Sequence, residues 1–137
     1  MMHDINMAAA IVAGIAYYAI GALWYTVLFG NAWMKSQGMD PKNPPAGMKE
    51  SAGKSMGLQL IVCLVLGVLF AVILKQLGVM TMHASLLSAF WIWLAFRATA
   101  GVTSVLFDRK SWMTFAINQG YDLVGFLAMA AILAAWK

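Results

Sequence analysis

The stretch that decides the fold is residues 55–77, SMGLQLIVCLVLGVLFAVILKQL. Apart from Gln59 inside it and a lysine near its end, it is apolar, and it exceeds the about 20 residues that an α-helix needs to cross a bilayer. Lys75 lies where its aliphatic stem can reach the membrane–water interface. A strand of a membrane barrel would instead alternate over about 10 residues. The stretch therefore predicts a transmembrane helix.

Three more apolar runs have the same character, at about 5–29, 82–107 and 111–136. We expect an all-α polytopic membrane protein, an antiparallel bundle of four transmembrane helices forming one domain over 1–137. The first run lacks the basic start of a cleaved signal peptide, so we interpret it as retained. Residues 31–54 are predicted to be a polar loop, because their prolines oppose a long helix.

The composition agrees with a lipid environment. Of 137 residues, 63% are hydrophobic and only 10% are charged, which is too few to cover a soluble globule of this size. The mean hydropathy is +0.79. The one cysteine, Cys63, excludes an intrachain disulfide and a site of several thiolates. Small residues at helical spacing, Cys63, Gly67 and Ala71 on one run and Gly14 and Gly21 on another, predict close helix packing.

The basic residues predict the orientation. Residues 31–54 and 108–110 contain six Lys or Arg, whereas the opposite side has Lys75 and Lys137. Basic loops stay in the cytoplasm, so we expect both loops to be cytoplasmic and both termini outside, in the inner membrane of the cell. The net charge of +4 then reflects topology and a weak attraction to anionic membrane lipid, and we expect no nucleic-acid partner.

Two charged residues fall inside the predicted spans, Arg97 and Asp122. They are equally far from the corner at 108–110, so in an antiparallel hairpin they lie level with each other. About 10 helical residues place each about 15 Å deep, near the middle of a hydrocarbon core about 30 Å thick. We expect them to contact each other and neither to face lipid. The pair is either a buried salt bridge that fixes helix register or a site for a solute or proton.

Other polar side chains are expected to join or approach this pair. Asn118, Asp122 and Gly125 follow helical spacing on the last run, and Arg97, Gly101 and Ser104 do so on the third. The candidate intramembrane polar cluster comprises Arg97, Asp122, Asn118, Tyr121, Tyr17, Tyr18, Tyr25, Gln59 and Ser104. Tyr25 and Gln59 lie nearer the basic loops, so a polar track towards the cytoplasm is expected.

Neither a metal nor another cofactor is expected. His3, Met82 and His83 have side chains that suit Cu(I), but methionine is abundant here and interfacial histidine is common. The sequence contains no serine–histidine–aspartate set, phosphate-binding loop or paired carboxylates, so we do not expect an enzyme.

The segments GALWY at 21–25 and LFGNAWMK at 28–35 resemble the hallmark of a bacterial membrane family catalogued as domain of unknown function number 1761. The segment INQGY at 117–121 resembles that family's second recognisable patch. The resemblance implies a small four-span membrane protein and supplies no activity. Within residues 21–35, we expect Trp24 and Tyr25 to pack near Asn118. We expect Gly30 to end the helix in a left-handed conformation and Trp33 to lie on a short interfacial segment.

The leading functional hypothesis is a homo-oligomer, with a dimer as the candidate form, whose polar cluster holds a small solute, ion or proton. The first alternative is an accessory or structural subunit of a larger membrane complex. The second is a membrane enzyme that acts on a lipid or quinone.

Overall fold

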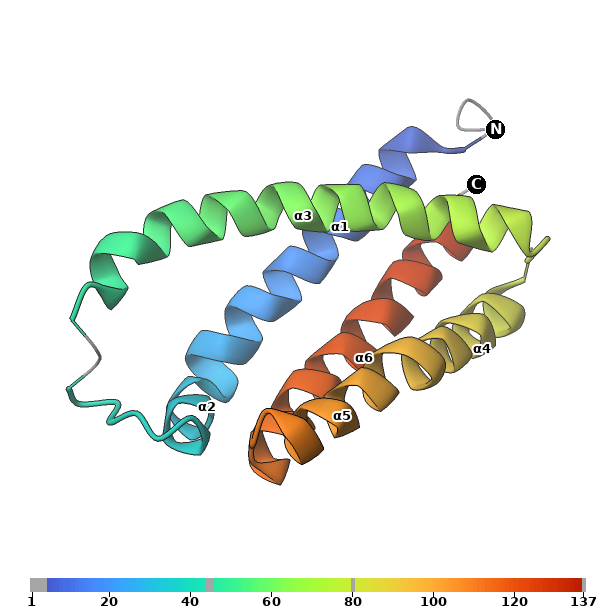
Figure 1. Cartoon of the computed structure of the whole chain (residues 1–137). Coiled ribbons are helices and arrows are strands. Elements are labelled where there is room, and N and C mark those ends of the chain that lie inside the picture. Colours follow the sequence, from blue (N-terminus) through green and yellow to red (C-terminus); the bar gives the residue numbers. More distant parts are fainter. Residues whose placement is uncertain (1–4, 44–45, 80, 137) are drawn as a thin grey trace.

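The computed structural model describes residues 5–43, 46–79 and 81–136, and within these ranges the regular elements are all helical (Figure 1). The expectation of an all-α protein is confirmed. In chain order the elements are α1 (Met7–Leu23), the π-helix η2 (Trp24–Leu28), α2 (Gly30–Ser36), α3 (Met48–Gln76), α4 (Met82–Ile92), the π-helix η3 (Trp93–Ala98), α5 (Thr99–Phe107) and α6 (Trp112–Ala135).

Four helices in the described ranges are long and apolar enough to cross a membrane: Met7–Leu28, Ser51–Gln76, Met82–Phe107 and Trp112–Ala135. The protein is therefore of the multi-pass membrane type that the hydropathy predicts. The polar segment 31–54 is shorter as a loop than expected, because α2 occupies its start and α3 begins at Met48. Gly47 turns the chain with φ +82°, and the residues that follow it are good helix formers.

The helix α6 lies between α1 and α4, and α3 packs mainly against α1 (Figure 1). Figure 1 shows α4 and α5 running beside α6, while α3 crosses α1 at a wide angle. Among the spans, α6 contributes the largest set of buried side chains, including Ile117, Tyr121, Phe126 and Met129. The α4–η3–α5 span is the outer member, with Ser85, Ala89 and Ala98 as its buried residues.

Small residues allow α1 and α3 to touch through their backbones. A methyl group added to Gly14 would lie 2.5 Å from the carbonyl oxygen of Cys63, and one added to Gly67 would lie 2.7 Å from the Gly14 nitrogen. Ala10 and Ala13 are fully buried at the same contact. The expected close packing of small residues is confirmed here, and dispersion contacts hold this crossing where lipid provides no hydrophobic driving force.

The first span ends differently from the expectation. The helix breaks at Phe29, whose φ of −129° and ψ of 13° are not helical, and Gly30 begins α2. Gly30 is not left-handed, so the prediction of a left-handed glycine cap is wrong. Glycine is needed for space instead, because a methyl group there would lie 2.8 Å from the Tyr25 carbonyl oxygen.

Candidate functional site

Arg97 and Asp122 meet between η3 and α6. The Arg97 Nε lies 3.0 Å from the Asp122 Oδ2, and one terminal guanidinium nitrogen lies 2.9 Å from the same oxygen. The contact predicted from their equal distance to the corner is therefore present. The Asp122 side chain is 5% exposed, whereas that of Arg97 is 52% exposed. Arg97 is half-exposed in the single chain because, among the described helices, its span packs against α6 on one side. The expectation that neither residue faces lipid stays a prediction.

The second oxygen of Asp122 is also occupied. Asp122 Oδ1 accepts a hydrogen bond from the Tyr17 hydroxyl, which comes from α1. The Tyr121 hydroxyl in turn donates to the Tyr17 carbonyl oxygen over 2.8 Å. A methyl group on Gly125 would lie 2.5 Å from the Tyr17 ring, so this glycine makes room for the ring. Tyr17, Arg97, Tyr121 and Asp122, hereafter the Asp122 cluster, thereby join three spans.

The two π-helices hold α6 from opposite neighbours. Trp24, the first residue of η2, donates its indole N–H to the Ile117 carbonyl oxygen over 2.9 Å. Trp93, the first residue of η3, donates to the Gln119 carbonyl oxygen over 2.9 Å. Single π-helical turns are rare in proteins, and those that occur are often found at functional sites. The sequence predicts that Trp24 packs near Asn118 but does not single out either indole as a donor; the need of a buried indole N–H for an acceptor was the signal available.

Tyr25 and Asn118 form a second polar contact, one turn from the Asp122 cluster. The Tyr25 hydroxyl donates to the Asn118 Oδ1 over 2.6 Å. The ring of Tyr25 stands edge-on to those of Tyr121 and Trp33, with centroids 5.5 and 6.0 Å away. The predicted packing of the Trp24–Tyr25 segment near Asn118 is therefore present.

The remaining predicted site residues lie apart from the Asp122 cluster. Tyr18 is half-buried and Gln59 is exposed, and both line a cavity of about 290 Å³ between α1, η2 and α3. Tyr25 and Tyr121 form the wall of this cavity that adjoins the cluster. Gln59 makes a contact of 3.6 Å to the Cys63 sulfur. Ser104 is half-buried about 10 Å further along α5 from Arg97.

Sequence reasoning also missed Gln119 as a site residue. It is buried beside Gly101, and its side-chain oxygen has no hydrogen-bond partner among the described residues. The indole N–H of Trp33 is likewise buried without one in the described chain. The position of Gln119, three residues before Asp122 on the same helix, was the signal available.

Metal-ligating side chains do not gather in the described ranges, which contain no group of three His, Cys, Asp or Glu residues suited to a metal. Met82 and His83 are exposed on the first turn of α4. His3 lies outside the described residues.

Comparison with family models adds one match, over residues 8–134, to the family described as "Protein of unknown function (DUF1761)". The chain belongs to this family. The DUF1761 match includes all of α6 but its last residue, both π-helices and every member of the Asp122 cluster, so the resemblance read from the two motifs is confirmed. Searches of curated proteins and of solved structures gave no match. The function of this DUF1761 protein must therefore be argued from its own residues.

Proposed function

We propose that this chain is an integral protein of a bacterial cell membrane, in which four antiparallel spans act as a homo-oligomer and the Asp122 cluster binds a small anionic or hydrogen-bond-accepting solute. The observation that carries the proposal is the half-exposed guanidinium of Arg97 at the middle of a span. Charged groups at this depth are costly and are found where they serve a pathway or a partner.

The geometry favours a solute that accepts hydrogen bonds. A guanidinium has five N–H donors, and the two described contacts of Arg97 go to a single carboxylate oxygen. Both oxygens of the Asp122 carboxylate already accept hydrogen bonds, Oδ1 from Tyr17 and Oδ2 from Arg97. An incoming solute therefore meets N–H donors and not a free carboxylate, which favours an anion over a cation.

A second copy of the chain would enclose this site. Arg97 lies on the outer span, so its exposed side opens onto the outside of a single chain and not into a central space. Four spans enclose little volume, and a site shared between two copies is the usual solution for a permeation path.

The competing proposal is a structural cluster in an accessory subunit, and a specific observation favours it. Tyr17 donates to Asp122 and Tyr121 donates to the Tyr17 carbonyl oxygen, while the two indole N–H groups donate to backbone carbonyl oxygens of α6, so these hydrogen bonds link three spans. Such a network fixes helix register without any ligand.

Thiol labelling with charged reagents separates the two proposals. In a Cys63→Ala background, Leu94→Cys places a thiol three residues before Arg97 in η3, at a position that is 39% exposed, and Phe96→Cys places one at a position that is 71% exposed. We expect the anionic sulfonatoethyl methanethiosulfonate to label Leu94→Cys at least about fivefold faster than the cationic trimethylammonium reagent, because Arg97 attracts anions. Phe96→Cys should resist both reagents.

Arg97→Gln in the same background should remove this preference. Equal rates for the two reagents at Leu94→Cys, or protection of Leu94→Cys from both while Asn43→Cys in the loop reacts, would contradict the solute site and favour the structural cluster.

The orientation of the protein is tested with the same chemistry. We expect residues 31–54 and 108–110 to face the cytoplasm, because they contain six of the basic residues. In intact cells, Asn43→Cys should therefore resist an impermeant maleimide and react after the membrane is permeabilised. Reaction of Asn43→Cys in intact cells would reverse the assignment.

A further inference from the structure

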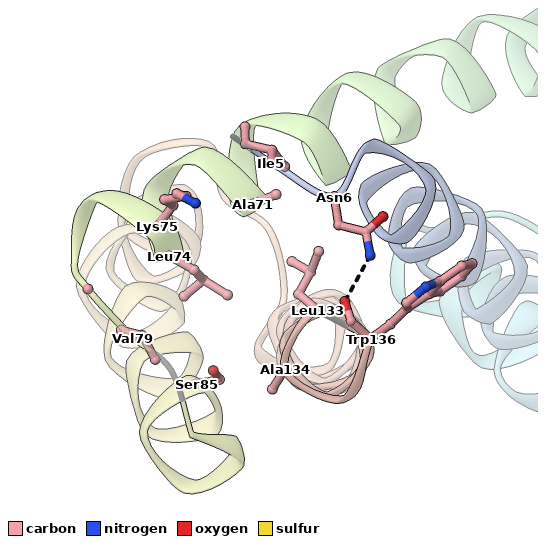
Figure 2. A pocket seen from close by; sticks show the side chains of 11 residues that line it. Ile5, Asn6, Ala71, Leu74, Lys75, Val79, Ser85, Leu133, Ala134 and Trp136 are labelled. Atoms are coloured by element: carbon pink, nitrogen blue, oxygen red, sulfur yellow. Dashed lines mark hydrogen bonds between the residues drawn. The ribbon is translucent and has the colours of Figure 1, made fainter. Parts of the chain in front are cut away.

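A separate pocket lies where α3 ends and α4 begins, and we call it the terminal pocket (Figure 2). Its volume is about 430 Å³, which falls in the range of about 300–1,000 Å³ that is usual for ligand sites. Its α6 wall is formed by Leu133 and Ala134, about 16 Å along the helix from Asp122. The terminal pocket is therefore distinct from the Asp122 cluster.

The walls of the terminal pocket are mostly apolar. Leu74 from α3 and Leu133 from α6 point into the space between these helices (Figure 2), and Ala71, Val79 and Ala134 complete this surface. Figure 1 shows why a space remains here, since the end of α3 passes across the end of α6 and does not run along it. An alkyl chain matches a cleft of this kind, because it can bury its surface against the leucine side chains.

Three polar side chains border the same space from different elements. Asn6 donates its amide N–H to the Trp136 carbonyl oxygen over 3.1 Å (Figure 2), and its side-chain oxygen accepts from the Ala9 nitrogen. Lys75 brings an ammonium group from α3, and Ser85 brings a hydroxyl from α4 that is 2% exposed. Ammonium and hydroxyl groups both donate hydrogen bonds, so the polar side of the pocket suits an anion.

The position along the spans identifies where such a ligand comes from. The first span starts at Met7, α3 ends at Gln76, α4 starts at Met82 and α6 ends at Ala135, and the terminal pocket lies among these four ends. The ends of spans lie at the membrane–water boundary, where phosphate groups meet acyl chains. The ligand with a phosphate head and an alkyl chain at this depth is a phospholipid.

We propose that the terminal pocket binds an anionic phospholipid of the surrounding bilayer, with its phosphate at Lys75 and Ser85 and the start of one acyl chain between Leu74 and Leu133. The lipid then fills the space between α3 and α6, whose described contacts with each other are few. It thereby ties the α3–α4 corner to the end of α6.

The test is a titration of the delipidated full chain in detergent, with binding followed by native mass spectrometry. Dioleoyl phosphatidylglycerol should bind saturably and about fivefold more tightly than dioleoyl phosphatidylcholine, which has no net charge, because one lysine near the surface contributes about this factor. Lys75→Gln should remove the difference. Lys54→Gln is the matched control, since Lys54 is an exposed lysine at the other end of the same helix, and it should change binding by less than about twofold.

Ala134→Phe tests the apolar part by filling the pocket, and it should abolish saturable binding while leaving the melting temperature without lipid at or above that of the parent. If Ala134→Phe does not fold, Ser85→Ala tests the polar part instead, because it removes the hydroxyl assigned to the phosphate and should weaken the binding of phosphatidylglycerol. Equal affinity for the two phospholipids in the parent chain, or equal effects of Lys75→Gln and Lys54→Gln, would overturn the proposal. Binding of oleate in preference to phosphatidylglycerol would also overturn it, in favour of a free fatty acid.

Discussion

The two π-helices, η2 and η3, begin alike and end differently. Each starts with a tryptophan that donates to a carbonyl oxygen of α6, and each contains a polar residue near the Asp122 cluster, Tyr25 in η2 and Arg97 in η3. After η2 the helix breaks at Phe29 and the chain turns into α2, which covers Tyr25 with Trp33. After η3 the helix continues directly into α5, and Arg97 stays half-exposed. A π-helix that begins with a tryptophan is thus followed by a covering helix in the first span, which we call the closed end, and by an uninterrupted helix with an exposed arginine in the third, which we call the open end.

The difference shows that the neighbours of a span, and not its own sequence, decide whether a polar group is covered. The η2 segment has α6 and α2 beside it, whereas the η3 segment packs against α6. Tyr25 on η2 therefore has protein around its ring, and Arg97 on η3 has protein on one side.

Removal of the Arg97 guanidinium should have the largest effect on this comparison. Arg97→Met leaves the buried Asp122 carboxylate without its cation, and we expect a loss of about 3–5 kcal/mol in the free energy of unfolding. Asp122→Asn should cost less, about 1–2 kcal/mol, because it keeps an acceptor for Tyr17 and leaves a guanidinium that is half-exposed. Reversible unfolding in mixed micelles measures both changes.

The double variant Arg97→Met with Asp122→Leu is the control for this prediction. It removes both charges, so it should be more stable than Arg97→Met alone. If both single variants have the same free energy of unfolding as the parent, the ion pair does not contribute to stability. The different exposure of Arg97 and Asp122 would then have no energetic consequence.

Glycine substitutions at equivalent places should distinguish the closed end from the open one. A methyl group at Gly30 would lie 2.8 Å from the Tyr25 backbone oxygen, so Gly30→Ala should cost about 1–3 kcal/mol. A methyl group at Gly101 would lie 2.6 Å from the end of the Gln119 side chain and 2.9 Å from the Phe115 ring; because both are side chains that can shift, Gly101→Ala should cost less than Gly30→Ala. Thermal melting in detergent compares the two.

Gly53→Ala provides the reference for both glycine variants. Gly53 is helical and has open space around it, so alanine there should be neutral or stabilise by up to about 1 kcal/mol. If Gly101→Ala lowers the melting temperature more than Gly30→Ala does, the α5–α6 contact tolerates an added methyl group less well than the turn after η2, which contradicts this prediction.

The tryptophan bonds to α6 should be of equal strength despite their different surroundings. Trp24→Phe and Trp93→Phe each remove one N–H donor and keep an aromatic ring, so each should cost about 1 kcal/mol. Unfolding of the single and double variants measures the two contributions and their additivity. A cost at Trp24 alone would indicate that the tilted contact of its ring with Phe29, with centroids 4.8 Å apart, matters more than its hydrogen bond.

The smallest effect is expected in the turn that follows α2. Hydrogen bonds from the Lys42 backbone N–H and the Asn43 amide lower the pKa of Asp40 below its ordinary value of 3.8. Because the folded pKa is the lower one, the turn is stabilised above the ordinary value, and this contribution is lost as the pH falls through the folded pKa. Titration of the Asp40 carboxyl carbon by NMR should show the shift, which Asn43→Ala should reduce. An ordinary pKa for Asp40 would show that these two hydrogen bonds do not stabilise the turn after α2.

Much of this arrangement could be predicted from the sequence because it follows from spacing. Unbroken apolar runs predict spans, and the equal distance of Arg97 and Asp122 from the corner at 108–110 predicts their contact, which is present. The motif around Trp24 and Tyr25 predicts packing near Asn118, and this packing is present as well.

The features that could not be predicted from the sequence depend on which helices are neighbours. The exposure of Arg97 follows from the outer position of its span, which hydropathy does not encode. The break at Phe29 follows from the close approach of Gly30 to the Tyr25 carbonyl oxygen, and an apolar sequence is compatible with α- and π-helical turns alike. Which helices lie side by side therefore has to come from the structure.

The hydrogen bond from Asn6 to the carbonyl oxygen of Trp136 nearly closes the described chain into a ring. Because these two residues lie side by side, a short linker between their positions would complete the ring. New ends could then be opened in the polar segment between α2 and α3, at the opposite end of the helices. A circular permutant made in this way would carry its tags at that end of the molecule, with every helix retained.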